Sequence, residues 1–113
     1  MAVGIPLTQF VEILSAQPLH LPTEGEAIAG VTTDSRAVQP GELFVALRGD
    51  RFDGHKFVET ALNQGAIAAV VDHAIESLPD APLLVVPDTL AAYQALGRWW
   101  RQQFTIPVIA VTG

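Results

Sequence analysis

The sequence contains no cysteine, which excludes a disulfide framework and any cysteine-ligated zinc or iron–sulfur site. It also lacks an apolar stretch approaching the roughly 18 residues that a membrane-spanning helix requires. The first residues show neither the basic segment nor the long apolar run of a signal peptide. We therefore expect a cytoplasmic protein that neither crosses nor binds a membrane.

Basic residues are also scarce, with 6 Lys and Arg against 12 Asp and Glu, and the net charge of −6 argues against binding to nucleic acid. Four of the six basic residues nevertheless fall between residues 32 and 57, where four acidic residues match them. That window is neutral, and the rest of the chain carries the whole negative charge. A small anion would bind most easily in this window, although chance clustering or local ion pairs explain the same pattern.

The chain has 113 residues, half of them hydrophobic, which is enough to bury the core of one domain. Predicted helices cover residues 7–15, 56–64 and 88–104, and predicted strands cover residues 27–31, 43–47, 66–71, 83–86 and 108–111. Prolines bracket residues 18–22, which we expect to form an extended connector. The alternation of strands and helices predicts an α/β fold with a small mixed or mainly parallel sheet flanked by helices. The residues expected to face the core include Phe44, Val45, Ala46, Phe57, Ala61, Leu62, Val70, Leu90, Tyr93, Gly97, Trp100 and Phe104.

Residues 32–36, which we call the hydroxyl loop, follow a predicted strand. Loops at the carboxyl ends of strands are the usual binding sites of open α/β sheets. The hydroxyl groups of Thr33 and Ser35, the carboxylate of Asp34 and the guanidinium of Arg36 suit a phosphate or the edge of a nucleobase. The alternative is a turn whose side chains satisfy only its own backbone.

Residues 48–57, which we call the glycine loop, follow the next predicted strand and lead into a helix. Gly49 and Gly54 would let the backbone approach a ligand closely, and the start of the helix favours an anion. Phe52 could stack on a flat base. Because His55 has no partners at ligand spacing, we predict no metal site, and no nucleophile–base pair suggests catalysis. We expect the two loops to lie side by side at one edge of the sheet.

Three segments resemble the N-terminal domain of the Mur ligases. They are residues 34–36, the Pro40-Gly41 turn with the apolar run 43–47 that follows it, and residues 52–55. The resemblance covers about residues 30–71. Residues 108–113 resemble the strand that precedes the family's phosphate-binding loop, with Thr112 and Gly113 as the beginning of that ATP site. The resemblance implies that residues 1–106 form a substrate-binding domain and that residues 107–113 begin a truncated central ATPase domain.

The resemblance also implies what this domain binds, namely the UDP part of UDP-N-acetylmuramoyl-tripeptide. The implied contact residues are Thr33, Asp34, Ser35, Arg36, Arg48, Gly49, Phe52, Asp53, Gly54 and His55. The full-length enzyme would use ATP and Mg, whereas this fragment would hold no cofactor, contain no catalytic residue and be an inactive monomer.

Two short segments, residues 48–55 and 88–92, resemble the branch of the family that adds D-alanyl-D-alanine with ATP hydrolysis. The branch that adds a diamino acid is the alternative within the family. Outside it, a stand-alone nucleotide-binding module and a structural domain without a ligand stay open.

Overall fold

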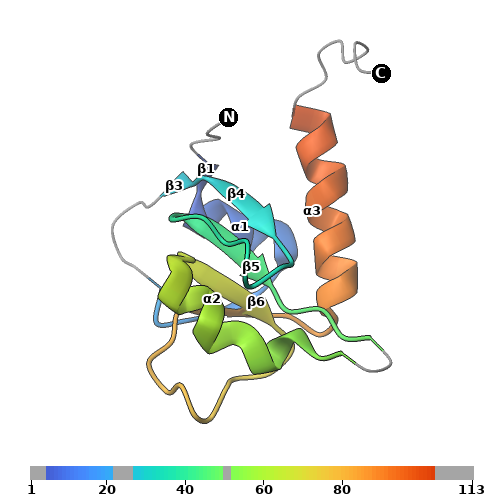
Figure 1. The fold of residues 1–113 in the computed structure, drawn as a ribbon. Coiled ribbons are helices and arrows are strands. Elements are labelled where there is room, and N and C mark those ends of the chain that lie inside the picture. Colours follow the sequence, from blue (N-terminus) through green and yellow to red (C-terminus); the bar gives the residue numbers. More distant parts are fainter. Residues whose placement is uncertain (1–4, 22–26, 50–51, 104–113) are drawn as a thin grey trace.

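The computed structural model describes residues 5–21, 27–49 and 52–103 (Figure 1). The elements are β1 (Ile5–Pro6), α1 (Leu7–Leu14), β2 (Gln17–Leu19), β3 (Ala27–Ile28), β4 (Gly30–Thr32), β5 (Glu42–Val45), the 3₁₀ helix η1 (Gly54–Phe57), α2 (Val58–Gln64), β6 (Ala68–Val71), β7 (Leu83–Val85) and α3 (Thr89–Gln103). No helix among these residues is long and apolar enough to cross a membrane.

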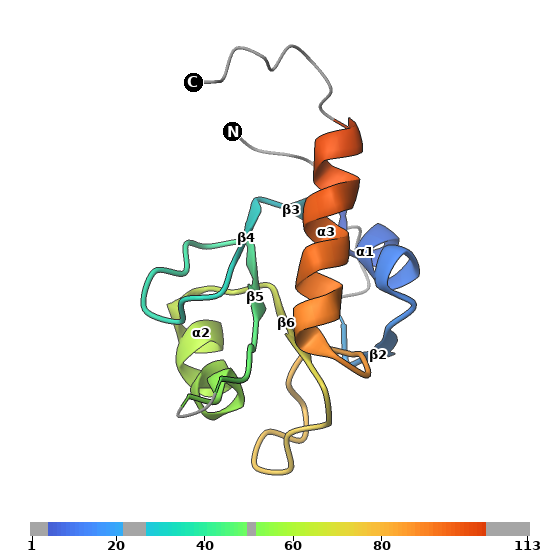
Figure 2. The same ribbon diagram turned by 90° about the vertical axis from the view of Figure 1, so that its right-hand side faces the viewer.

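The main sheet has five strands in the order β2-β7-β6-β5-β4. Strands β4 to β7 are parallel, and β2 joins the β7 edge in the antiparallel direction. Helix α2 covers one face of this sheet, while α1 and α3 cover the other (Figure 2). The prediction of a mixed α/β sheet flanked by helices is therefore confirmed.

Strand β5 is buried on both faces, as its continuous apolar run predicted. Leu43 and Val45 pack into the cluster beneath α1 and α3, whereas Phe44 and Ala46 pack into the cluster beneath α2. Both faces of the sheet are thus sealed by apolar side chains.

Two strand predictions differ from the structure. The predicted strand 27–31 is divided at Ala29, because β3 pairs with β1 in a separate two-stranded sheet while β4 pairs with β5. The predicted connector contains strand β2, in which Pro18 lies opposite Leu84. An edge strand tolerates proline because one side of its backbone needs no partner in the sheet.

The helices agree with the sequence in position but not in every buried face. Asp88 caps α3 by accepting the N–H groups of Leu90 and Ala91, and Gly65 ends α2 with a φ of 117°. However, Leu90 and Tyr93 are exposed, so the predicted inward stripe of α3 was wrong. Its buried face carries Ala92, Leu96 and Trp99 instead, and the Trp99 ring meets the Phe10 ring of α1 edge to face, with centroids 5.9 Å apart.

Phe57 was also predicted to face the core and is exposed, because the helix begins with the 3₁₀ turn η1, which changes the direction of its first side chains. The predicted strand 108–111, with Thr112 and Gly113, lies outside the described residues, and so does Phe104. The division of the chain after residue 106 therefore stays a prediction.

Candidate functional site

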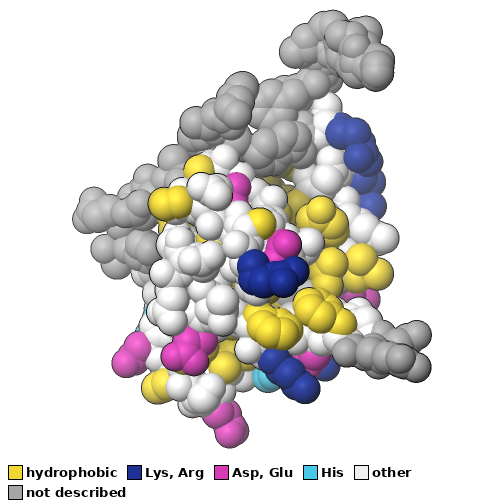
Figure 3. All heavy atoms as spheres, viewed as in Figure 1, with side chains coloured by type: hydrophobic (Ala, Val, Ile, Leu, Met, Phe, Trp, Pro, Cys, Tyr) yellow, Lys and Arg dark blue, Asp and Glu magenta, His cyan; other side chains and the backbone are white. Residues whose placement is uncertain are grey.

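The hydroxyl loop and the glycine loop border one hollow of about 510 Å³ on the surface. Its lining residues are Thr33, Asp34, Ser35, Arg36, Phe52, Phe57 and Thr60. Figure 3 shows this face of the molecule, where apolar side chains gather around a basic one. Both loops contribute residues to this hollow, so they lie side by side as expected.

The hydroxyl loop is a turn that satisfies its own backbone. The Asp34 N–H donates to the Thr32 hydroxyl at 3.1 Å, and the Arg36 N–H donates to the Asp34 carboxylate at 2.9 Å. These bonds fix the loop with Ser35 tucked in, only 8% exposed, against the hollow. Arg36 points outward with its side chain 87% exposed, and its nearest carboxylate oxygen, on Asp34, is 3.7 Å away. Arg36 is therefore free to approach an anion.

The glycine loop supplies a flat apolar wall to the same hollow. The rings of Phe52 and Phe57 are stacked, with centroids 5.7 Å apart and planes 15° apart. Both side chains are substantially exposed, at 49% and 39%. Phe52 was predicted as a binding residue, and Phe57 joins it because the 3₁₀ turn leaves its ring outside the core. A pair of exposed, parallel aromatic rings is a surface on which a nucleobase can stack.

Gly54 and His55 face inward rather than toward the hollow. The Gly54 N–H donates to the Leu47 carbonyl at 2.7 Å, and a Cβ at this position would lie 2.9 Å from the Leu47 nitrogen. A side chain therefore has no room here, and the glycine brings the loop back against its own strand. His55 is buried beside Gly54, and its hydrogen-bond partners are other residues of the protein.

Those partners fix the His55 ring from both sides. Asp53 accepts the His55 backbone N–H at 3.0 Å and contacts Nδ1 at 2.7 Å through the same oxygen. Nε2 accepts the backbone N–H of Asp72 at 3.0 Å, so the proton of a neutral ring belongs on Nδ1. His55 thereby joins the glycine loop to the end of β6.

Arg48 makes the second connection to β6. Its Nε and Nη2 donate to the two carboxylate oxygens of Asp72 at 2.6 and 3.0 Å, and its Nη1 donates to Asp53 at 3.2 Å. The hydrogen bonds from Arg48 hold the pKa of Asp72 well below its usual range, and the same contact raises the pKa of Arg48. Partial burial raises the pKa of Asp53, but the hydrogen bonds from His55 outweigh it, so the pKa lies below its usual value. Arg48 is engaged in the protein and does not line the hollow.

The sequence did not single out Asp72, although one signal was available. Asp72 is the first polar residue after the buried strand β6, so it lies at the same carboxyl edge of the sheet as both loops. The rule that led to the loops applies equally to this position.

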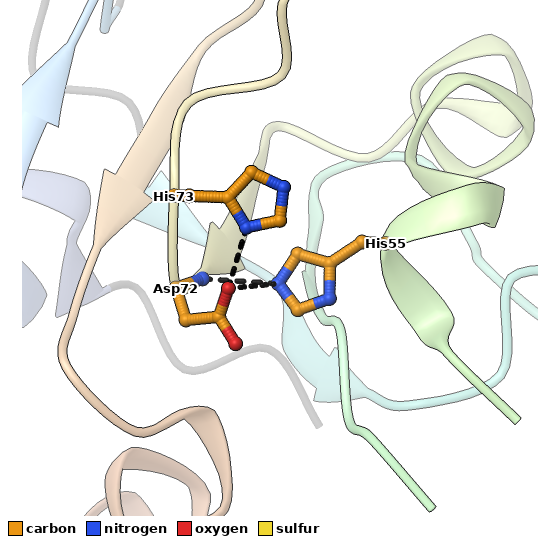
Figure 4. A group of neighbouring side chains, drawn as sticks. All are labelled: His55, Asp72 and His73. Atoms are coloured by element: carbon orange, nitrogen blue, oxygen red, sulfur yellow. Dashed lines mark hydrogen bonds and ion pairs between the residues drawn. The ribbon is translucent and has the colours of Figure 1, made fainter.

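His55, Asp72 and His73 bring three metal-ligating atoms within 4.8 Å of one another (Figure 4). Two features argue against a cation site. Nε2 of His55 already accepts the Asp72 N–H, and the guanidinium of Arg48 neutralises the Asp72 carboxylate. The hydrogen bonds and the ion pair of Asp72 already explain why these three side chains lie close together.

A larger hollow of about 730 Å³ lies between β4 and α3. Its lining residues are Gly30, Val31, Tyr93, Gln94, Leu96, Gly97, Arg98 and Arg101. Neither strand-end loop contributes to it, and it has no hydroxyl groups beyond the phenol of Tyr93. The smaller hollow combines hydroxyls, an exposed guanidinium and stacked rings, so it is the better candidate for specific recognition despite its size.

Comparison with known proteins decides the family. A family model described as "Mur ligase family, catalytic domain" matches residues 27–99, a range that contains both loops and Asp72. The chain belongs to the Mur ligase family. The match runs from β3 into α3 and so contains the segments that carried the resemblance in the sequence.

Individual relatives agree with this membership. The chain is 49% identical over 92 residues to UDP-N-acetylmuramoyl-tripeptide--D-alanyl-D-alanine ligase of Synechocystis sp., covering 80% of this chain and 20% of that protein. It is 35% identical over 109 residues to UDP-N-acetylmuramoyl-L-alanyl-D-glutamate--2,6-diaminopimelate ligase of Syntrophomonas wolfei, covering 95% and 22%. The crystal structure of MurF from Acinetobacter baumannii superimposes with a TM-score of 0.75 at 32% identity, covering 89% of this chain and 22% of that one. The chain thus spans about a fifth of the length of these Mur ligases.

Proposed function

We propose that this chain is the domain of a D-alanyl-D-alanine-adding Mur ligase that holds the UDP end of UDP-N-acetylmuramoyl-tripeptide. The observation that carries the proposal is the hollow in which a hydroxyl-rich turn meets a stacked aromatic pair. The names of similar ligases, which act on UDP-N-acetylmuramoyl peptides, support UDP as the nucleotide. D-alanyl-D-alanine ligases recur among the similar proteins, and MurF recurs among the similar solved structures, which supports this branch of the family.

In this proposal the residues of the hollow divide the ligand between them. The uracil stacks on Phe52, and the hydroxyls of Ser35 and Thr33 bond to its polar edge or to the ribose. The exposed guanidinium of Arg36 approaches the diphosphate. Arg48, Asp53, Gly54 and His55 act on binding only through the shape of the loop, since they are bonded within the protein.

The chemistry of the complete enzyme belongs to other parts of a longer protein. We propose that it adds D-alanyl-D-alanine to the tripeptide carboxylate with ATP and Mg, acts as a monomer in the cytoplasm, and begins its ATP site at Thr112 and Gly113. The residues described in this chain would then contribute substrate binding and no catalytic group.

The direct test is calorimetric titration of the 113-residue protein with UDP, using ADP as a matched ligand that keeps the ribose and diphosphate but changes the base. UDP is expected to bind weakly and ADP more weakly still, because the pocket recognises the base as well as the charge. Added salt should weaken UDP binding, since attraction between Arg36 and the diphosphate is screened.

The site is tested by Phe52→Ala, with Leu90→Ala as its control. Both side chains are 49% exposed, but only Phe52 lines the hollow. Loss of base stacking is worth about 1–3 kcal/mol, so Phe52→Ala should weaken UDP binding by roughly five- to a hundredfold. Leu90→Ala should leave the affinity unchanged. Equal effects of the two changes, or no UDP binding by the unaltered protein, would contradict the proposal.

The branch of the family is tested with a full-length enzyme that contains this domain. Incubation with UDP-N-acetylmuramoyl-tripeptide, ATP and D-alanyl-D-alanine should release phosphate, whereas a UDP-N-acetylmuramoyl-dipeptide offered with a diamino acid should not. The opposite preference would assign the chain to the diamino-acid-adding branch.

A further inference from the structure

Both ends of the glycine loop are tied to one residue outside it, Asp72. Arg48 at the start of the loop donates two hydrogen bonds to the Asp72 carboxylate, and His55 near its end accepts the Asp72 backbone N–H. Asp53 links the two ends directly, since it accepts from Arg48 and from His55. The result is a closed ring of hydrogen bonds anchored on the end of β6.

Phe52 lies in the sequence between Arg48 and Asp53, two residues of this hydrogen-bonded network. Arg48 and Asp53 pair as an isolated antiparallel bridge, and the Gly49 N–H donates to the Phe52 carbonyl. The Phe52 ring then projects from the closed loop onto Phe57 and into the hollow. Its position relative to the hydroxyl loop therefore depends on how firmly the loop is held to β6.

We propose that Asp72 is a positioning residue for nucleotide binding, which holds the Phe52–Phe57 pair in place beside the hydroxyl loop without touching the ligand. This inference rests on the proposed function. Asp72 does not line the hollow, so any effect of changing its carboxylate on affinity is transmitted mainly through Arg48, while the bond from the backbone N–H of residue 72 to His55 remains.

The physical reason is preorganisation. A loop already fixed by hydrogen bonds does not lose conformational freedom when a ligand binds, whereas a loose loop must be ordered by the ligand. Releasing one or two aromatic side chains should weaken binding roughly tenfold.

The test compares Asp72→Asn with Asp88→Asn, each of which removes one negative charge from an aspartate that accepts backbone or side-chain hydrogen bonds. Asp88 caps α3 and makes no contact with either loop among the described hydrogen bonds. Asp72→Asn should weaken UDP binding about tenfold and reduce the NMR cross-relaxation between the Phe52 and Phe57 rings. Asp88→Asn should leave the UDP affinity and the contact between the two aromatic rings unchanged, because asparagine caps a helix about as well as aspartate.

A double variant separates positioning from direct contact. If Arg48 and Asp72 act as one link, Arg48→Ala combined with Asp72→Asn should bind UDP no more weakly than the worse single variant. Additive losses would mean that Arg48 meets the ligand itself, and would overturn the link.

Failure of this inference differs from failure of the proposed function. If the unaltered protein does not bind UDP, the proposed function fails, and the ring contact in Asp72→Asn still tests positioning. An unchanged ring contact, or an unchanged UDP affinity in Asp72→Asn, overturns the positioning role.

Discussion

The two loops that border the hollow are held in place by different kinds of contact. The hydroxyl loop is held mainly by hydrogen bonds between residues two positions apart, such as Arg36 N–H to Asp34, with one distant bond from the Gln64 side chain to the Arg36 carbonyl. The glycine loop is fixed by bonds to Asp72, which is 24 positions from Arg48 and 17 from His55. The turn of the hydroxyl loop thus depends mainly on its own sequence, whereas the glycine loop combines local bonds with bonds to the end of β6.

The difference also concerns charge. The Arg36–Asp34 pair is exposed and 3.7 Å apart, and such pairs contribute little stability. Arg48 meets Asp72 through two hydrogen bonds, and the Asp72 side chain is only 18% exposed. Arg48 is therefore bonded within the protein, whereas Arg36 stays exposed and contacts the ligand only in our proposal, although the sequence presents both as candidate anion contacts.

The largest expected effect comes from removing the scaffold that both loops share. Phe44 is 1% exposed in β5, so Phe44→Ala should lower the free energy of unfolding by about 3–5 kcal/mol. Phe52→Ala removes a half-exposed side chain that lines the hollow, and it should cost only about 0.5–1.5 kcal/mol, the worth of its stacking on Phe57. Urea denaturation of both variants checks this, and similar losses would mean that the hollow is part of the core.

A smaller effect is expected where the glycine loop meets its own strand. Gly54→Ala places a Cβ 2.9 Å from the Leu47 nitrogen and should cost about 1–3 kcal/mol. Gly49→Ala is the matched control, because its nearest atom would be 3.8 Å away. Thermal unfolding of the pair should separate them clearly. Equal stability would show that the close return of the loop to Leu47 is not required.

The pH dependence of stability should distinguish the tertiary network from the local turn. The pKa values of Asp72 and Asp53 are lowered in the folded protein. Their contribution is complete above the unfolded pKa of about 4 and is lost as the pH falls through the lower folded values. The free energy of unfolding should therefore decrease less in Asp72→Asn than in the unaltered protein between about pH 5 and about pH 2. Parallel urea series at several pH values measure this, and identical slopes would contradict the pKa shift.

The smallest effect on stability is expected in the hydroxyl loop. Ser35→Ala should change the free energy of unfolding by less than about 0.5 kcal/mol, because backbone bonds from neighbouring residues hold the turn. It should weaken UDP binding by roughly two- to tenfold, the worth of one hydrogen bond. Melting curves and calorimetry test the two halves separately. A variant that melts at a much lower temperature but binds UDP as tightly as the unaltered protein would make Ser35 a structural residue only.

The same distinction explains what the sequence could predict. The run around Phe44 predicted a strand buried on both faces, because burial of such a run depends on neighbouring residues. For the hydroxyl loop the sequence offered a binding loop or, as the alternative, a turn that satisfies its own backbone; the structure shows the turn, and binding stays a prediction. Strand β2 was missed because proline normally argues against a strand, and only its place at the edge permits Pro18.

The remaining errors concern contacts between distant segments. The buried face of α3 depends on its packing against Phe10 of α1, and the outward position of Phe57 depends on the 3₁₀ turn. The partner shared by Arg48 and His55 could not be identified until β5 and β6 were paired. Side-chain roles in the glycine loop therefore required the fold, whereas its place beside the hydroxyl loop did not.

The most direct measurement is an NMR titration of isotopically labelled protein with UDP. The account predicts saturable shifts in the amides of Thr33–Arg36 and in the ring signals of Phe52 and Phe57, with the signals of α1 unchanged. No response to millimolar UDP, or a response confined to the hollow between β4 and α3, would contradict it.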